Sequence, residues 1–267
     1  METAEDLSPA TIAGTLRTGR FGRALHYFAT AGSTNDIARE LARSGAPEGT
    51  VVLAEEQTRG RGRLGRAWLA PPRSCLLLSL VLRPALAVEE AFRLTMLCSV
   101  AAAVAVERAT GLRPELKWPN DLLLGGKKLA GLLSEASALG GRLEYAVVGI
   151  GLNVNFDPLV FPDIASTATS LQAALGRPAS RLGLLRELLA EVEDRYSQLF
   201  ATSAAEDALW LEWRRRLGTL GRQVVVTEGE RRERGLAYDV ARDGSLLLRR
   251  DDGSEVAIAV GDVTLRG

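Results

Sequence analysis

The chain has 267 residues, of which 46% are hydrophobic and 25% charged, as expected for one large globular domain, alone or with a small second one. Its 33 basic and 33 acidic residues give a net charge of zero, so no global field would recruit nucleic acid or an anionic membrane. The N-terminus lacks a signal peptide pattern, and the longest apolar stretch, residues 94–106, falls short of the roughly 20 residues of a membrane span.

The cysteine and histidine content argues against a metal site built from these residues and against a disulfide framework. Cys75 and Cys98 stand in apolar runs without CxxC spacing, so we expect two buried, reduced thiols and a cytoplasmic protein. His26 is the sole histidine in the sequence, and with no cysteine or second histidine near it we expect a structural role.

Helical and strand patterns alternate through most of the chain. Ser33 indicates a helix N-cap, with Asp36 at the capping-box spacing and Gly45 as the stop. The other predicted helices cover residues 89–110, 167–175, 181–200 and 205–217. The predicted strands cover residues 51–54, 75–82, 112–118, 121–124, 128–136 and 145–151, with a hairpin turn at Gly125-Gly126. The pattern predicts an α+β fold over residues 25–217, a mixed or antiparallel sheet with helices packed on it, after a short helical or frayed leader over residues 1–24.

The pattern changes at residue 218. Short alternating segments follow, with the turn signals Asp243-Gly244 and Asp252-Gly253 between them. The segments cover residues 223–227, 234–240, 246–249 and 255–259. We therefore expect residues 218–267 to form a small β-barrel domain.

A loop rich in glycine and arginine follows the first buried strand. Residues 60–65 match G-x-G-x-x-G, but Pro71 and Pro72 prevent the helix that a dinucleotide site needs at the last glycine. No acid occurs from residue 57 to residue 88, whereas six arginines do: Arg59, Arg61, Arg63, Arg66, Arg73 and Arg83. Guanidinium forks suit carboxylate and phosphate, so we expect a loop that is mobile when empty and ordered by anions. The alternative is a solvated basic loop.

A second cationic group surrounds the next hairpin. Lys117 and Lys128 flank a rigid Trp118-Pro119 segment and the pair Asn120-Asp121, where Asp121 could hold Mg²⁺ together with substrate phosphates. The alternatives are two solvated lysines and a turn-capping acid. Gly126-Lys127-Lys128 lacks the glycine spacing and the Ser or Thr of a Walker A loop, and a role for Lys127 is left open.

The apolar strand over residues 145–151 ends in glycine and asparagine. Gly149 and Gly151 would let a flat ring approach the backbone, and Asn153 could pair with an adenine edge. The alternative is a strand bent by glycine, with Asn153 in the following turn. Because no Ser/His/Asp arrangement is recognisable, the chemistry should depend on cations and positioning.

From about Phe28 to the C-terminus the sequence resembles biotin protein ligases. The resemblance rests on the order and spacing of the following segments: Ser33-Thr34-Asn35, Glu56-Gln57-Thr58, the Gly60–Trp68 loop, Lys117-Trp118-Pro119-Asn120-Asp121, Lys128-Leu129-Ala130-Gly131 and Gly149-Ile150-Gly151-Leu152-Asn153. It implies a class II synthetase-like catalytic domain and an SH3-like C-terminal barrel. It also implies two reactions: biotin attacks the α-phosphate of ATP to give biotinoyl-5′-AMP, and a lysine of a carrier protein then displaces AMP.

The resemblance also implies roles for individual residues. Lys128 would be the main catalytic residue, assisted by Arg63. The biotin-binding residues would be Ser33, Thr34, Asn35, Gln57, Arg61, Gly62, Arg63 and Lys128. The ATP-binding residues would be Arg61, Arg63, Arg66, Trp68, Lys117, Asn120 and Asn153. Asp121 would bind Mg²⁺, and ATP and biotin would be the substrates.

The implied partner is the biotin carboxyl carrier protein of acetyl-CoA carboxylase. Only 32 residues precede Ser33, too few for the winged-helix domain of some relatives, so we expect a ligase without DNA binding or repression. No membrane partner is expected, and a homodimer is left open. The sequence departs from many relatives at Arg59 and Leu64, which redistributes charge along the loop.

Two rival functions have different sequence requirements. A lipoate or octanoate ligase or transferase would share the fold, but it would need apolar residues where Ser33 and Gln57 stand. An RNA-binding module would use the Arg-Gly run as a phosphate grip, but such readers interleave exposed aromatics, and Trp68 is the only aromatic residue near this run.

Overall fold

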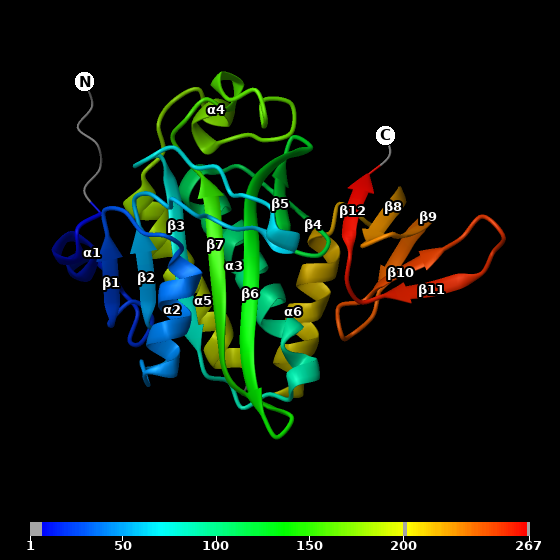
Figure 1. Cartoon of the computed structure of the whole chain (residues 1–267), viewed down its shortest axis with the longest axis horizontal. Coiled ribbons are helices and arrows are strands. Elements are labelled where there is room, and N and C mark those ends of the chain that lie inside the picture. Colours follow the sequence, from blue (N-terminus) through cyan, green and yellow to red (C-terminus); the bar gives the residue numbers. More distant parts are fainter. Residues whose placement is uncertain (1–6, 200–201, 266–267) are drawn as a thin grey trace.

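The computed structural model describes residues 7–199 and 202–265, and its largest element is a seven-stranded mixed sheet (Figure 1). The strands lie in the order β1 (Leu25–Phe28), β2 (Val51–Ala54), β3 (Cys75–Leu82), β7 (Arg142–Asn153), β6 (Lys127–Leu139), β5 (Asp121–Leu124) and β4 (Glu115–Lys117). The β1–β2 pair is parallel and the other pairs are antiparallel. The prediction of a mixed sheet with helices on it is confirmed.

Helices cover both faces of this sheet (Figure 1). On one face lie α3 (Phe92–Thr110), α5 (Arg181–Leu199) and α6 (Ser203–Arg216), and α3 is buried from Leu94 to Val106. Its alanines allow close approach to the strands. On the other face, α2 (Thr34–Arg43) packs Ala38 and Ala42 against β2, β3 and β7. Within the described residues, no helix has both the length and the apolar character that a membrane crossing needs.

Several predicted boundaries were wrong for local reasons. The helix expected from residue 89 starts at Phe92, because Val88–Glu90 forms a 3-10 turn in which Glu90 bonds the Ala87 N–H. The helix expected from residue 167 begins only at Leu171 (α4, Leu171–Leu175). The segment before it is held in a bridge to β6, because the Lys128 N–H donates to the Thr167 carbonyl and the Lys128 carbonyl accepts from the Thr169 N–H. The expected leader contains α1 (Pro9–Thr15), and its first six residues lie outside the described part of the chain.

The C-terminal residues form a separate antiparallel sheet of five strands. Its order is β11 (Glu255–Ile258), β10 (Leu246–Arg249), β9 (Arg231–Val240), β8 (Gln223–Glu228) and β12 (Asp262–Leu265). The small all-β unit is therefore confirmed, although the ladders of the described residues do not close it into a barrel. The domain limits at residues 24 and 217 stay a prediction.

Trp118 attaches the small sheet to the large one. Its indole N–H donates to the Gly244 carbonyl at 2.8 Å, and its main-chain N–H donates to the Thr219 hydroxyl at 3.0 Å. Phe92 packs so tightly against Gly244 that a Cβ there would lie 2.0 Å from its ring. The turn between β4 and β5 is thus fixed to the C-terminal sheet.

Both cysteines are free and buried, as predicted. Burial raises the pKa of Cys75 to about 11 and that of Cys98 to about 12, so neither is a nucleophile near neutral pH.

Candidate active site

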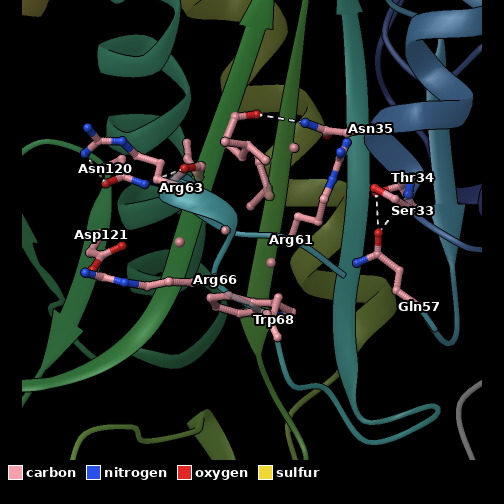
Figure 2. Close-up of a pocket in the computed structure, with 18 of the residues that line it drawn as sticks. Ser33, Thr34, Asn35, Gln57, Arg61, Arg63, Arg66, Trp68, Asn120 and Asp121 are labelled. Carbon is pink, nitrogen blue, oxygen red and sulfur yellow. Dashed lines mark hydrogen bonds between the residues drawn. The ribbon is translucent and has the colours of Figure 1, made fainter. Parts of the chain in front are cut away.

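Two cavities meet on the face of the sheet that α2 covers, and Figure 2 shows residues that line the first of them. The first has a volume of about 130 Å³ and the second about 550 Å³, and both are lined by Arg66, Trp68, Asp121 and Lys128. Among the predicted site residues, the first cavity also collects Ser33, Thr34, Asn35, Gln57, Arg61, Gly62, Arg63 and Asn120, and the second collects Lys117 and Asn153. The structure therefore brings every predicted site residue into one continuous site, while their individual roles stay predictions.

Gln57 and Thr34 form the polar end of the first cavity (Figure 2). The Gln57 Oε1 accepts from the Thr34 main-chain N–H at 2.7 Å and from its hydroxyl at 3.1 Å. Because an N–H can only donate, this contact fixes the amide orientation and leaves Nε2 as the outward donor. Ser33 occupies the N-cap position of α2 but makes no side-chain cap bond, so the predicted capping box is wrong.

Asn35 is held by protein groups on every side. Its amide nitrogen donates to the Leu133 carbonyl at 3.1 Å and to Glu135 at 2.8 Å, and its oxygen accepts from the Ser79 hydroxyl at 2.6 Å. A Cβ on Gly149 would lie 2.2 Å from that oxygen. Asn35 therefore joins α2 to the sheet, with its hydrogen-bonding groups already occupied.

The arginine loop folds back on itself across the site. Its ends are joined by the Arg61–Ala67 bridge and by the Gly62 N–H, which donates to the Arg66 carbonyl at 2.7 Å. A short 3-10 turn, Arg63–Gly65, stands where a dinucleotide site would start a helix, as the prolines predicted. At its tip, Leu64 is 65% exposed and has a φ of 55°, a left-handed conformation that costs a non-glycine residue energy.

The loop arginines contact acids and carbonyls around the cavity. Arg61 donates to Asp36 at 2.5 Å. Arg63 donates to the Asn120 side chain at 3.4 Å and to the Gly261 carbonyl at 3.2 Å. Burial lowers the pKa of Arg63, and the nearby charge of Asp262 opposes this change. Arg66 forms an ion pair with Asp262, although Arg66 itself stays mostly exposed.

The Trp68 ring packs against two glycines of the large sheet, Gly131 of β6 and Gly151 of β7. A Cβ on Gly151 would come within 2.6 Å of the indole, and one on Gly131 would come within 3.0 Å. The Lys128 ammonium lies 5.4 Å from the ring centroid, within the range of a cation–π contact. Among the described residues, the buried Trp68 N–H finds no hydrogen-bond acceptor.

Lys128 and Asp121 lie where the cavities join. The Lys128 ammonium is 2.7 Å from the Asp121 carboxylate. The β5–β6 ladder shifts by one residue between Leu122 and Leu123, a bulge of the kind that re-aims side chains near active sites. Burial lowers the pKa of Lys117, with Lys128 adding repulsion and Asp121 opposing both.

Asn153 lines the second cavity and supports its wall. Its amide nitrogen donates to the Thr169 carbonyl at 2.9 Å and to the Lys128 carbonyl at 3.4 Å. Both amide hydrogens are therefore used within the protein, and its contact with adenine stays a prediction.

Sequence reasoning missed several functional neighbours. Ser79 orders both Thr34 and Asn35 through its hydroxyl, yet it stands in an apolar run without a distinguishing signal. Asp262 reaches the loop from the C-terminal sheet, and its approach depends on how the two sheets pack.

Comparisons with known proteins agree with this geometry. Residues 27–153 match the biotin/lipoate A/B protein ligase family, and residues 219–266 match the biotin protein ligase C-terminal domain. The bifunctional ligase/repressor BirA of Bacillus subtilis is 36% identical over 92% of this chain and 76% of its own length. The biotin–[acetyl-CoA-carboxylase] ligase of Mycobacterium tuberculosis is 38% identical over 90% of this chain and 88% of its own.

A solved structure gives the same result for the fold. The biotin protein ligase of Aquifex aeolicus in complex with biotin and ATP superposes with a TM-score of 0.77 at 28% identity, covering 91% of this chain and 99% of that one. The high coverage includes both sheets. The chain therefore belongs to the biotin protein ligase family.

Proposed function

We propose that this protein activates biotin with ATP to give biotinoyl-5′-AMP and pyrophosphate, and then transfers biotin to a lysine of a carrier protein. The observation that carries the proposal is the meeting of two cavities at Lys128 and Asp121. A small acid and a nucleotide, bound one in each cavity, would touch where these side chains lie. The Aquifex aeolicus relative was solved with biotin and ATP, which supports the substrate pair.

We place biotin in the first cavity with its ureido ring at the polar end. The Gln57 Nε2 would donate to the ureido oxygen, and the hydroxyls of Ser33 and Thr34 would serve the ring N–H groups. The valeryl carboxylate would then extend toward Lys128. Asn35 would act by holding α2 in place, because its own hydrogen-bonding groups are occupied.

We place ATP in the larger second cavity, with adenine between Trp68 and the wall that Asn153 supports. Lys117 would lie along the same nucleotide path. The phosphates would run toward Arg63, Arg66 and Asn120, where forked donors are available. The buried Trp68 N–H would find its missing acceptor on a bound ligand.

The chemistry would then depend on position and charge. A carboxylate oxygen of biotin attacks the α-phosphorus, and the bond to pyrophosphate breaks. Lys128 would neutralise the attacking carboxylate and the α-phosphate together, while Arg61, Gly62 and Arg63 close the loop over the adenylate and exclude water. In the second reaction the lysine amine attacks the acyl carbon, AMP leaves, and the amine loses a proton.

Mg²⁺ is the proposed companion of the triphosphate. Within the described residues, no three histidine, cysteine or acidic side chains gather as metal ligands. Asp121 at the cavity junction and the Asn120 oxygen in the first cavity fit an ion that takes most of its ligands from phosphates and water. When bound, Mg²⁺ would supply further neutralisation of phosphate charge.

The proposed acceptor is the biotin carboxyl carrier protein of acetyl-CoA carboxylase. The name of the Mycobacterium tuberculosis relative supports it. The two free thiols support a reducing, cytoplasmic setting.

The test is a substrate comparison. The protein, ATP and Mg²⁺ are incubated with biotin or with lipoate, and pyrophosphate is measured. We expect release with biotin and little with lipoate, because lipoate has no ureido group to occupy Gln57. Release with lipoate alone would replace the substrate assignment with the rival one, and transfer of biotin to a purified carrier domain tests the second reaction.

A further inference from the structure

Three cations of the site each lie in close contact with a carboxylate in the structure. Arg61 pairs with Asp36, Lys128 with Asp121, and Arg66 with Asp262. Asp36 and Asp121 belong to the catalytic sheet and its helix. Asp262 is different, because it stands in the C-terminal sheet.

Asp262 and Gly261 contact two of the three loop arginines, Arg63 and Arg66. Arg66 pairs with one carboxylate oxygen of Asp262, and the other oxygen lies 3.8 Å from the Arg63 guanidinium. The same Arg63 nitrogen donates to the Gly261 carbonyl at 3.2 Å. The Arg66–Asp262 contact is an ion pair, and its Asp262 oxygen has no hydrogen-bond partner among the described residues. One acid thus occupies the place between two arginines that a phosphate would occupy.

Asp262 is anchored well enough to serve as a fixed point. It opens β12 and pairs with Thr227 of β8, and its side chain is only 21% exposed. The sheet that carries it is fixed to the β4–β5 turn through Trp118 and Gly244. By contrast, the loop makes few contacts at its tip, where Leu64 is exposed. We therefore expect the loop, and not the C-terminal sheet, to move when the ion pairs break.

We propose that Asp262 is an internal competitor of the nucleoside triphosphate, holding Arg63 and Arg66 until phosphate displaces it. The inference rests on the proposed function, because it assumes that phosphates enter this cavity. A triphosphate carries more charge than one carboxylate, and so exchanges the Asp262 pairs for stronger ones. The C-terminal sheet would then set how much nucleotide is needed to free the loop.

The test compares Asp262→Asn with Asp251→Asn, which removes an equal charge from an exposed turn of the same sheet. Without substrates, trypsin should cut the loop of Asp262→Asn about two- to fivefold faster than wild type, the ratio expected for losing one partly screened ion pair. Its affinity for ATP, measured without biotin, should rise by a similar factor. Asp262→Glu should restore slow cleavage, and Asp251→Asn should match wild type in both measurements.

Two results would overturn the proposal. Unchanged loop cleavage in Asp262→Asn would show that the carboxylate holds nothing, and weaker ATP binding would show that Asp262 assists the nucleotide. The cleavage assay uses no substrate, so it reports on the loop even if the wild type proves unable to bind ATP. Raising salt on the wild type should also speed cleavage, because it screens the same pairs.

Discussion

The cations of this site come from two regions of different construction. Lys117 and Lys128 stand on strands of the large sheet, where neighbouring ladders fix their positions. Arg61, Arg63 and Arg66 stand on a loop whose only regular element is a single 3-10 turn. The comparison suggests a division of tasks, in which the sheet defines where the two substrates meet and the loop closes the site afterwards.

Glycines show the same contrast. On the sheet, Gly131, Gly149 and Gly151 are needed because a side chain there would collide with Trp68, Lys128 or Asn35. On the loop, a Cβ at Gly62 would have its nearest neighbour at an ordinary 3.6 Å. These sheet glycines therefore make space for other side chains, whereas Gly62, where a Cβ would fit, contributes conformational freedom to the loop.

The largest effect should come from removing the sheet-borne lysine at the junction. Lys128→Ala should lower pyrophosphate formation by about 100- to 1,000-fold, the usual loss when one preorganised charge-stabilising group is removed. Its thermal unfolding should change little, because Lys128 is 38% exposed and its pair with Asp121 is partly screened. The matched control is Lys127→Ala, the adjacent lysine that lines neither cavity. Near-normal adenylate formation by Lys128→Ala would remove the catalytic assignment.

The glycine contrast can be tested with one methyl group in each region. Gly151→Ala should lower kcat/KM for ATP by about tenfold, because the indole of Trp68 must shift and misplace the nucleotide. Gly62→Ala should have a smaller effect, since its backbone suits alanine and its Cβ meets no obstacle. Steady-state kinetics on both variants give the ratio. Equal losses of kcat/KM in the two variants would mean that the space beneath Trp68 matters no more for catalysis than the conformational freedom of the loop.

The smallest effect concerns the stability cost of a buried sheet lysine. Burial lowers the pKa of Lys117, so Lys117→Met should stabilise the empty protein at neutral pH, by on the order of 1 kcal/mol. The unfolded chain keeps this proton to a higher pH than the folded chain. The unfolding free energy of wild type should therefore rise relative to Lys117→Met as pH approaches the ordinary value of 10.5. Urea titrations across this range measure the difference, and a constant difference would contradict the burial effect.

Strands with continuous apolar sequence were the easiest elements to predict. Cys75–Leu82 was placed correctly because its residues are buried on both faces and leave no other interpretation. Leu25–Phe28 was missed because it is a short edge strand of half-buried residues that includes His26. Asp262–Leu265 was missed because it begins with a charge and alternates over four residues. Such strands are stabilised by pairing with neighbouring strands more than by the β-propensity of their own residues.

The candidate site shows the same difference between features that local sequence indicates and features that depend on packing. Local patterns directed attention to Lys128 and Arg63 because both belong to cationic segments with recognisable chemistry, whereas Gln57 was selected through the family resemblance alone. The attachments of these side chains could not be read locally. Asn35 bonds to Glu135 across the sheet, and Arg63 meets Gly261 almost 200 residues later in the chain. These contacts depend on packing between elements, which composition does not encode.

Trp118 joins the two sheets at a place that also serves the site. Lys117 precedes it in the chain, and Asn120 and Asp121 follow Pro119, so its neighbours in sequence line the two cavities. Its indole N–H donates a hydrogen bond to the Gly244 carbonyl. Cutting the chain near residue 217 would leave a large aromatic ring bare and an N–H without its acceptor. The two halves should accordingly melt in a single transition, and neither is suited to being produced as an independent fragment.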